Sequence, residues 1–163
     1  MSHRWRMKEM LKKDLFQLQK ILNSLKNIQN TRFSYVVLKN LRKINAEIEV
    51  LDNLQQMNDN IIREYEEERI ALCIQHAEKN DKDEPVIENN RYRMLDMDAF
   101  SKELEELRSK YEEDINAHSK GQEEYTRLLM ERCDIDFYKI KYDNLPDNLT
   151  TLQLELLLNI IED

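Results

Sequence analysis

The sequence predicts a mostly α-helical protein with a small β component (α+β), folded as a single domain over residues 1–163. One glycine and two prolines occur in 163 residues, where average usage gives roughly eleven and eight, so few positions favour turns. A hydrophobic content of 40% argues against wholesale disorder. Apolar residues recur at helical spacing. We therefore expect a long antiparallel helical hairpin, then a small sheet built from a β-hairpin and a strand, with two or three further helices.

The first predicted helix covers residues 7–29. Its leucines recur at alternating steps of four and three, the period of one apolar helix face. They are Leu11, Leu15, Leu18, Leu22 and Leu25. Asn30 and Thr31 then provide a helix stop and a cap for the next helix, so the chain should fold back on itself.

The second predicted helix is long, residues 33–77, because no glycine or proline interrupts residues 32–84. Val37, Leu41, Ile44 and Ile48 repeat the same spacing. At ~1.5 Å per residue this helix would be roughly 65 to 70 Å long, more than a compact domain is wide. Either the C-terminal segments cover its second half, or another chain does, or the helix breaks within the polar residues 52–60.

A β-hairpin is predicted at residues 85–95, because Asn89 and Asn90 tolerate the positive φ of a tight turn between short apolar runs. The helix after it, residues 97–119, is capped by Asp96 or Asp98 and should end near Gly121.

Residues 133–142 are the best strand candidate, and we expect them to join the hairpin in one small sheet. Thr150 and Gln153 form a capping box at the start of a final helix, residues 150–162. This helix is apolar nearly all round, so it needs to be buried against the protein or a partner.

Charge is distributed unevenly along the chain. Residues 1–45 hold eleven Lys and Arg against two acidic residues, a net charge of +9. Because the whole chain has a net charge of −8, the remaining residues carry a net charge of −17. The basic residues fall between the apolar positions of amphipathic helices, where solvated side chains belong. We interpret them as a solvated face that pairs with acidic neighbours in the fold or in another subunit.

Metal chemistry is not expected. Cys73 and His76 stand three residues apart, and His118 and Cys133 could complete a tetrahedral site only if the fold brought them together. Structural zinc sites usually show two close pairs, and here only one pair is close. We expect neither a metal nor a cofactor, and both cysteines should be free thiols.

Catalysis is not expected either. Asp134 and Asp136 share a strand face and are the best carboxylate pair, but the solvent side of an edge strand explains them. A single glycine excludes glycine-rich phosphate loops. Arg4, Trp5 and Arg6 are the one basic and aromatic cluster near a chain end, and we do not expect nucleic-acid binding from them.

No membrane association is expected, because no run of about eighteen apolar residues exists. The first twenty residues also contain no uninterrupted apolar segment of the kind found in signal peptides. We expect the protein to remain inside the cell that makes it.

Several stretches together resemble a family of small, functionally uncharacterised proteins of tailed bacteriophages and prophages. The resemblance covers nearly the whole chain and lies in "LFQLQKIL", "FSYVVLKNLRKINAEIEVLDN", "AEKNDKDEPVIENNRYRMLDMDAFSKELEEL" and "IDFYKIKYDNLPDNLTTLQLELLLNIIED". The chain departs from that pattern by an additional segment, residues 108–127. The resemblance implies a phage accessory protein in the host bacterial cytoplasm or the virion, and no catalytic residues.

We therefore expect a non-enzymatic protein–protein interaction protein, acting in virion assembly or as a small structural component. The partner is a host or phage protein, or a second copy in a homo-oligomer. The alternatives are an inhibitor of a host defence or nucleic-acid enzyme that acts through its acidic surface, and a metal-dependent enzyme. The candidate partner interface consists of Leu152, Leu156, Leu157, Ile160, Ile161, Ile61, Ile62 and Tyr65.

Overall fold

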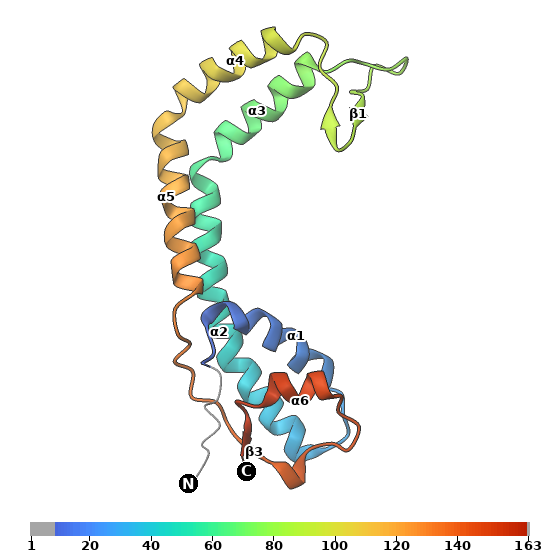
Figure 1. Ribbon diagram of the computed structural model, residues 1–163, viewed down its shortest axis with the longest axis vertical. Helices are drawn as coiled ribbons and strands as arrows, with labels where there is room; N and C mark the ends of the chain where they lie inside the picture. Colours follow the sequence, from blue (N-terminus) through green and yellow to red (C-terminus); the bar gives the residue numbers. More distant parts are fainter. Residues whose placement is uncertain (1–8, 163) are drawn as a thin grey trace. The chain divides into compact units, whose positions relative to one another are not determined.

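The computed structural model describes residues 9–162, which are mostly helical with short strands (Figure 1). The α-helices are α1 (Leu15–Leu25), α2 (Thr31–Ile61), α3 (Arg63–His76), α4 (Met97–Lys110), α5 (Glu112–Leu129) and α6 (Thr151–Leu157). The strands are β1 (Ile87–Glu88), β2 (Arg91–Tyr92), β3 (Ile140–Lys141) and β4 (Ile161–Glu162), and the 3-10 turns are η1 (Lys12–Asp14) and η2 (Tyr142–Asn144). The predicted class is confirmed. The predicted first helix, residues 7–29, is too long at both ends: among the described residues it is α-helical only over Leu15–Leu25, because Leu11 forms an antiparallel bridge with Arg132 and Lys12–Asp14 form a 3-10 turn. Residues 7 and 8 and the Arg4, Trp5 and Arg6 cluster lie outside the described residues.

The chain divides into two compact units. Unit 1 consists of residues 1–54 and 125–163, and unit 2 consists of residues 55–124. Helices α2 and α5 contribute residues to both units.

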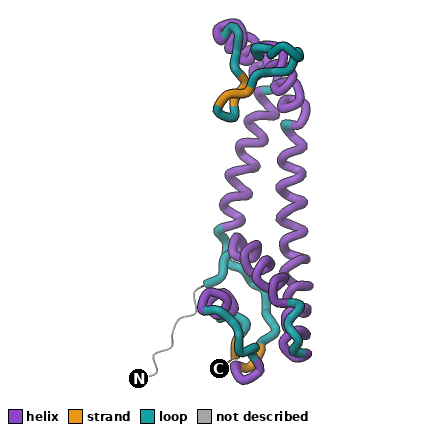
Figure 2. Tube along the Cα trace, turned by 90° about the vertical axis from the view of Figure 1, so that its right-hand side faces the viewer, coloured by secondary structure: helices purple, strands orange, loops and turns teal. Residues whose placement is uncertain are grey.

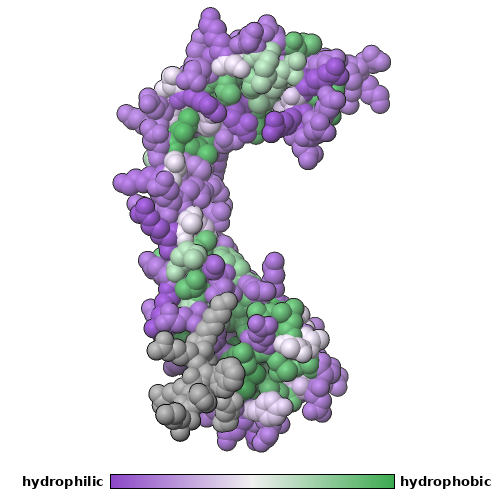
Figure 3. All heavy atoms as spheres, in the orientation of Figure 1, coloured by the Kyte–Doolittle hydropathy of each residue, from purple (hydrophilic) through white to green (hydrophobic). Residues whose placement is uncertain are grey.

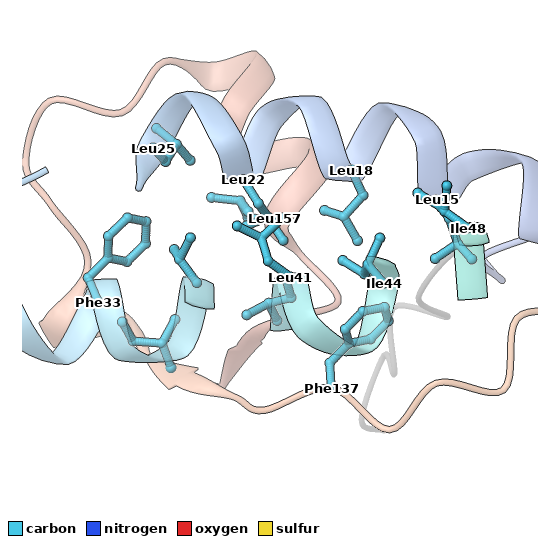
Figure 4. Packing of buried hydrophobic residues seen from close by; sticks show 13 residues of the cluster. Leu15, Leu18, Leu22, Leu25, Phe33, Leu41, Ile44, Ile48, Phe137 and Leu157 are labelled. Carbon is cyan, nitrogen blue, oxygen red and sulfur yellow. The ribbon is translucent and has the colours of Figure 1, made fainter. Parts of the chain in front are cut away.

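The core of unit 1 lies between α1 and the first part of α2. Figure 4 shows Leu15 beside Ile48 at one end and Leu25 beside Phe33 at the other, so the two helices are antiparallel as predicted. Asn30 caps α2, since its Oδ1 accepts a hydrogen bond of 3.1 Å from the Phe33 backbone N–H. Burying each large side chain of this kind stabilises the fold by roughly 1.5 to 3 kcal/mol.

Helix α6 packs on α1 and adds to the same core. It begins with the predicted capping box, in which the Gln153 N–H donates to Thr150 Oγ1 (3.2 Å) and the Thr150 N–H to Gln153 Oε1 (2.9 Å). The prediction that the helix continues to residue 162 is wrong. It ends at Leu157, because the chain then pairs as β4 with β3, placing Ile161 opposite Ile140 in a parallel register.

The strand predicted over residues 133–142 is also wrong in extent and in partner. Only Ile140–Lys141 pair, and they pair with β4 rather than with the β1–β2 hairpin. The segment before β3 lies against α2 and η1, where Phe137 is buried in the core and the Cys133 N–H donates to the Met10 carbonyl (2.8 Å). This hydrogen bond belongs to an isolated antiparallel bridge between Leu11 and Arg132, and not to a sheet with the β1–β2 hairpin.

Unit 2 contains the predicted hairpin. Ile87 pairs with Tyr92 and Glu88 with Arg91, and Asn89 and Asn90 have φ of 52° and 61° in the turn. The hairpin adjoins the ends of α3 and α4, since the Leu95 N–H donates to the His76 carbonyl (3.1 Å), and Figure 2 shows it in orange beside these helices.

The predicted helices 33–77 and 97–119 are each interrupted. The first stays helical through residues 52–60 and breaks at Ile62 (φ −105°, ψ 13°), and the second breaks at Tyr111 (φ −110°, ψ 22°). The rings of Tyr65 and Tyr111 lie 5.8 Å apart, so the two breaks occur beside each other, and α3 and α4 stay packed. Neither break involves glycine or proline, the usual sequence signals.

Gly121 does not end a helix, as the sequence predicted, but lies inside α5. A Cβ at this position would lie 2.0 Å from Oδ1 of Asn58 on α2. The absence of a side chain at Gly121 therefore allows α2 and α5 to approach closely at this point. This packing overrides the low helix propensity of glycine.

Candidate interaction surfaces

The C-terminal part of the predicted interface is divided between core and surface. Leu157 and Ile160 are only 2% and 3% exposed and belong to the unit 1 core, so assigning them to a partner interface was wrong. Leu157 is buried because α6 packs on α1, and Ile160 lies beside the β3–β4 pairing, where its carbonyl accepts a hydrogen bond from the Ile140 N–H. Leu156 and Ile161 are partly buried, and Leu152 is exposed.

The exposed side of α6 carries a second apolar residue that the prediction omitted. Leu152 is 59% exposed, and Leu158, one residue beyond the helix end, is 55% exposed. Figure 3 shows hydrophobic residues gathered on the face of unit 1 that carries α1 and α6. We call Leu152 and Leu158 the α6 surface; Leu152 is the member that the sequence predicted.

The predicted interface residues in unit 2 are likewise only partly available. Tyr65 is buried against Tyr111, so its assignment to an interface was wrong. Ile62 is half-buried at the break between α2 and α3, and Ile61 is 38% exposed.

Unit 2 exposes apolar residues near its hairpin that the sequence analysis did not single out. Leu95 is 72% exposed and Met97 is 61% exposed. They flank Asp96, whose carboxylate caps α4 by accepting hydrogen bonds from the Asp98 and Ala99 N–H groups. The capping geometry fixes this turn, so the two side chains are held at the surface by local structure.

A row of alternating tyrosine and lysine side chains lies on unit 1. Tyr35, Lys39 and Lys43 are spaced by four residues on α2 and share a helix face. Lys39 Nζ lies 5.5 Å from the Tyr35 ring centre and 5.3 Å from that of Tyr138, and Lys43 Nζ lies 4.4 Å from the Tyr138 ring. These are cation–π distances. We call these four residues the Lys–Tyr row.

Asn40 holds Tyr138 in this row. Its Nδ2 donates to the Tyr138 carbonyl (3.0 Å), and its Oδ1 accepts from the Tyr138 N–H (2.9 Å). Asn40 is fully buried, whereas the Tyr138 and Tyr35 side chains are exposed. The sequence spacing marks the α2 members of the row, but only the fold shows that Tyr138 joins them.

Unit 2 contains a lysine–tyrosine pair that binds a carboxylate. Lys110 Nζ lies 5.1 Å from the ring centre of Tyr111. Lys110 Nζ and Tyr111 Oη donate to Glu68 Oε1 over 3.1 and 2.9 Å. The hydrogen bond from Tyr111, followed by that from Lys110, lowers the pKa of the Glu68 carboxyl. The same hydrogen bond to Glu68 raises the pKa of Tyr111.

The histidines and cysteines considered for a metal site have other contacts. His76 Nε2 lies 2.7 Å from Glu103 Oε2, and His118 Nε2 lies 3.8 Å from Asp59 Oδ1. Cys73 and Cys133 are free thiols. Within residues 9–162, no group of three or more His, Cys, Asp or Glu residues could hold a metal ion.

Asp134 and Asp136 are exposed and lie in the segment that precedes β3. The Asp136 contact that the structure shows is made by its backbone carbonyl, which accepts a hydrogen bond from Lys43 Nζ. Cys133, next to this pair, is partly buried, and desolvation raises the pKa of its thiol. A thiol of raised pKa is a weaker nucleophile at neutral pH.

No family model, curated protein sequence or solved structure matches this chain. In the part of the chain that the structure describes, no helix is both long and apolar enough to cross a membrane.

Proposed function

We propose that this chain is a phage-encoded, non-enzymatic interaction protein that acts in virion assembly or as a small structural component, in the host cytoplasm or the virion. The observation that carries the proposal is the exposure of Leu95 and Met97 beside a fixed helix cap. Apolar side chains held at the surface in this way favour contact with another protein. The phage origin rests on the resemblance of the sequence stretches.

Two surfaces are suited to this contact, one on each unit. On unit 2 it is the turn with Leu95 and Met97, and on unit 1 it is the α6 surface with Leu152 and Leu158. Covering a large apolar side chain contributes roughly 1.5 to 3 kcal/mol, so a few such residues anchor a specific complex.

The alternative is an inhibitor that presents acidic residues to a host enzyme with a basic nucleic-acid groove. Unit 2 supports it, because it contains twenty Asp and Glu against ten Lys and Arg, a net charge of −10. Glu64 and Glu67 are exposed on α3 and form no ion pair among the described residues. Such a complex would depend on charge more than on apolar contact.

The test is capture of a partner by the tagged full-length chain from a lysate of phage-infected host cells. The wild type is compared with Leu95→Ala/Met97→Ala, and with Lys102→Ala/Arg108→Ala as a matched control on exposed polar positions of α4. Captured proteins are quantified at low salt and at about 1 M salt, where the screening length falls to ~3 Å.

We expect the wild type and the control to retain the same partner at both salt concentrations, and the apolar variant to retain at least about tenfold less. A host enzyme that is captured at low salt, is released at high salt and is insensitive to Leu95→Ala/Met97→Ala would favour the inhibitor. A wild-type chain that captures nothing would contradict both.

A further inference from the structure

In unit 2, Lys110 and Tyr111 together bind a carboxylate. The ammonium group lies near the tyrosine ring, and both groups donate to one carboxylate oxygen of Glu68. The lysine supplies charge and the phenol supplies a directed hydrogen bond, so the carboxylate is held by two donors.

The Lys–Tyr row in unit 1 repeats this arrangement without a carboxylate. Lys39 lies between the rings of Tyr35 and Tyr138, and Lys43 lies over the Tyr138 ring. Neither lysine forms an ion pair with an acidic residue of the described chain. Lys43 donates to a backbone carbonyl, which leaves its positive charge uncompensated.

The row is also held in place before any partner binds. The two hydrogen bonds between the buried Asn40 side chain and the backbone of Tyr138 fix that backbone, and the helical backbone of α2 fixes the spacing of Tyr35, Lys39 and Lys43. Because the backbone under the row is already ordered, its ordering costs no further conformational entropy when a partner binds.

We propose that the Lys–Tyr row binds carboxylates on the acidic unit 2 of a second copy of this chain. This rests on the proposed function, because it names one partner of an interaction protein. Charge complementarity favours the second copy, since its unit 2 has a net charge of −10 and the row presents two lysines that form no ion pair among the described residues.

The test measures the mass of the purified full-length chain by light scattering at low salt and at about 1 M salt. Lys39→Glu/Lys43→Glu reverses both charges of the row. The matched control is Lys20→Glu/Lys26→Glu, which makes the same change of charge at two exposed lysines of the α1 region. Circular dichroism and thermal melting verify that both variants remain folded.

We expect the wild type and the control to exceed the monomer mass at low salt and to dissociate at high salt. The row variant should be a monomer at low salt, with self-association weakened at least about tenfold. A wild type that is monomeric at both salt concentrations would overturn the proposal, as would equal behaviour of the row variant and the control.

A mixing experiment tests whether unit 2 is the surface that is bound. The row variant keeps its acidic unit 2, so a tagged wild-type chain should retain it, while a tagged row variant should not retain itself. If the wild type cannot retain the row variant, an intact row is needed on both chains. The acidic unit 2 is then not the surface that the row binds, and the proposal fails.

Nucleic acid is the alternative anionic partner of the row, and fluorescence anisotropy with a labelled single-stranded oligonucleotide tests it. We expect no difference between the wild type and the row variant. The wild type could instead be a monomer that binds the oligonucleotide, with the binding abolished by Lys39→Glu/Lys43→Glu. That result would identify nucleic acid, and not a second copy, as the partner of the row. If self-association fails while partner capture persists, only this inference falls; if both fail, the proposed function falls too.

Discussion

The Asn40 side chain forms two hydrogen bonds with the backbone of Tyr138, the same two that a neighbouring β-strand would form. The amide nitrogen donates to the carbonyl and the amide oxygen accepts from the N–H, at 3.0 and 2.9 Å. One fully buried side chain thereby attaches an extended segment to the side of α2, where the Lys–Tyr row forms.

Replacing Asn40 by Ala should destabilise the protein by about 1 to 3 kcal/mol, because two backbone groups of Tyr138 lose their partners. The free energy of unfolding in urea measures this. Asn45→Ala, on the same helix and exposed, removes a hydrogen bond with Gln19 and should change stability by less than about 0.5 kcal/mol. Similar costs for the two variants would show that Asn40 does not attach the segment.

Gly121→Ala should destabilise unit 2 by about 1 to 3 kcal/mol, because the added methyl group would lie 2.0 Å from Asn58 Oδ1 and Asn58 is buried. In the Asn58→Ala background the sign should reverse, since Ala exceeds Gly in helix propensity by about 1 kcal/mol. Asn58→Ala breaks no hydrogen bond of Nδ2, which is buried without a partner among the described residues. A double-mutant cycle by chemical unfolding measures the coupling, and additive effects would refute the contact.

Leu157→Ala should cost about 2 to 5 kcal/mol, because Leu157 is 2% exposed in the core. Leu152→Ala on the same helix should cost less than about 0.5 kcal/mol, because Leu152 is 59% exposed. Thermal or urea unfolding of the purified chain checks both values. If Leu152 proved the costlier residue, the orientation of α6 would be wrong.

The Glu68 carboxyl should titrate below its ordinary pKa of 4.5, since Tyr111 and Lys110 donate hydrogen bonds to its charged form. Because the folded-state pKa is lowered, this contact stabilises the protein above pH 4.5, and the contribution is lost as the pH falls through the lowered pKa. NMR titration of the Glu68 side chain measures the pKa, and Tyr111→Phe should raise it toward 4.5. A Glu68 pKa unchanged by Tyr111→Phe would contradict this assignment.

The sequence was sufficient for features that depend on local chemistry. The four-three spacing of leucines predicted the α1 face that packs on α2, and this core is confirmed by Leu15 through Leu25. Asn89 and Asn90 predicted the hairpin turn, and Thr150 with Gln153 predicted the start of α6. In the turn and the capping box, the local structure is determined by residues within a few positions of each other in the sequence.

Features that depend on distant residues were missed. The breaks at Ile62 and Tyr111 involve neither glycine nor proline, and they lie beside each other through the contact of Tyr65 with Tyr111. The position of Gly121 inside α5 goes with its close approach to Asn58. Residues 133–139 alternate like a strand but are attached through Asn40, which lies about a hundred positions earlier in the sequence. Burial of Leu157, Ile160 and Tyr65 likewise could not be distinguished from an apolar partner surface, because both favour the same residue types.

The most direct test of self-association through the Lys–Tyr row is to locate the contact on the wild-type chain by NMR. Side-chain signals of Tyr35, Tyr138, Lys39 and Lys43 would be followed on dilution at low salt. These signals should shift with concentration, together with those of acidic residues of unit 2, and about 1 M salt should abolish the shifts. Signals of the row that do not change with concentration, while the chain remains larger than a monomer, would contradict self-association through the row.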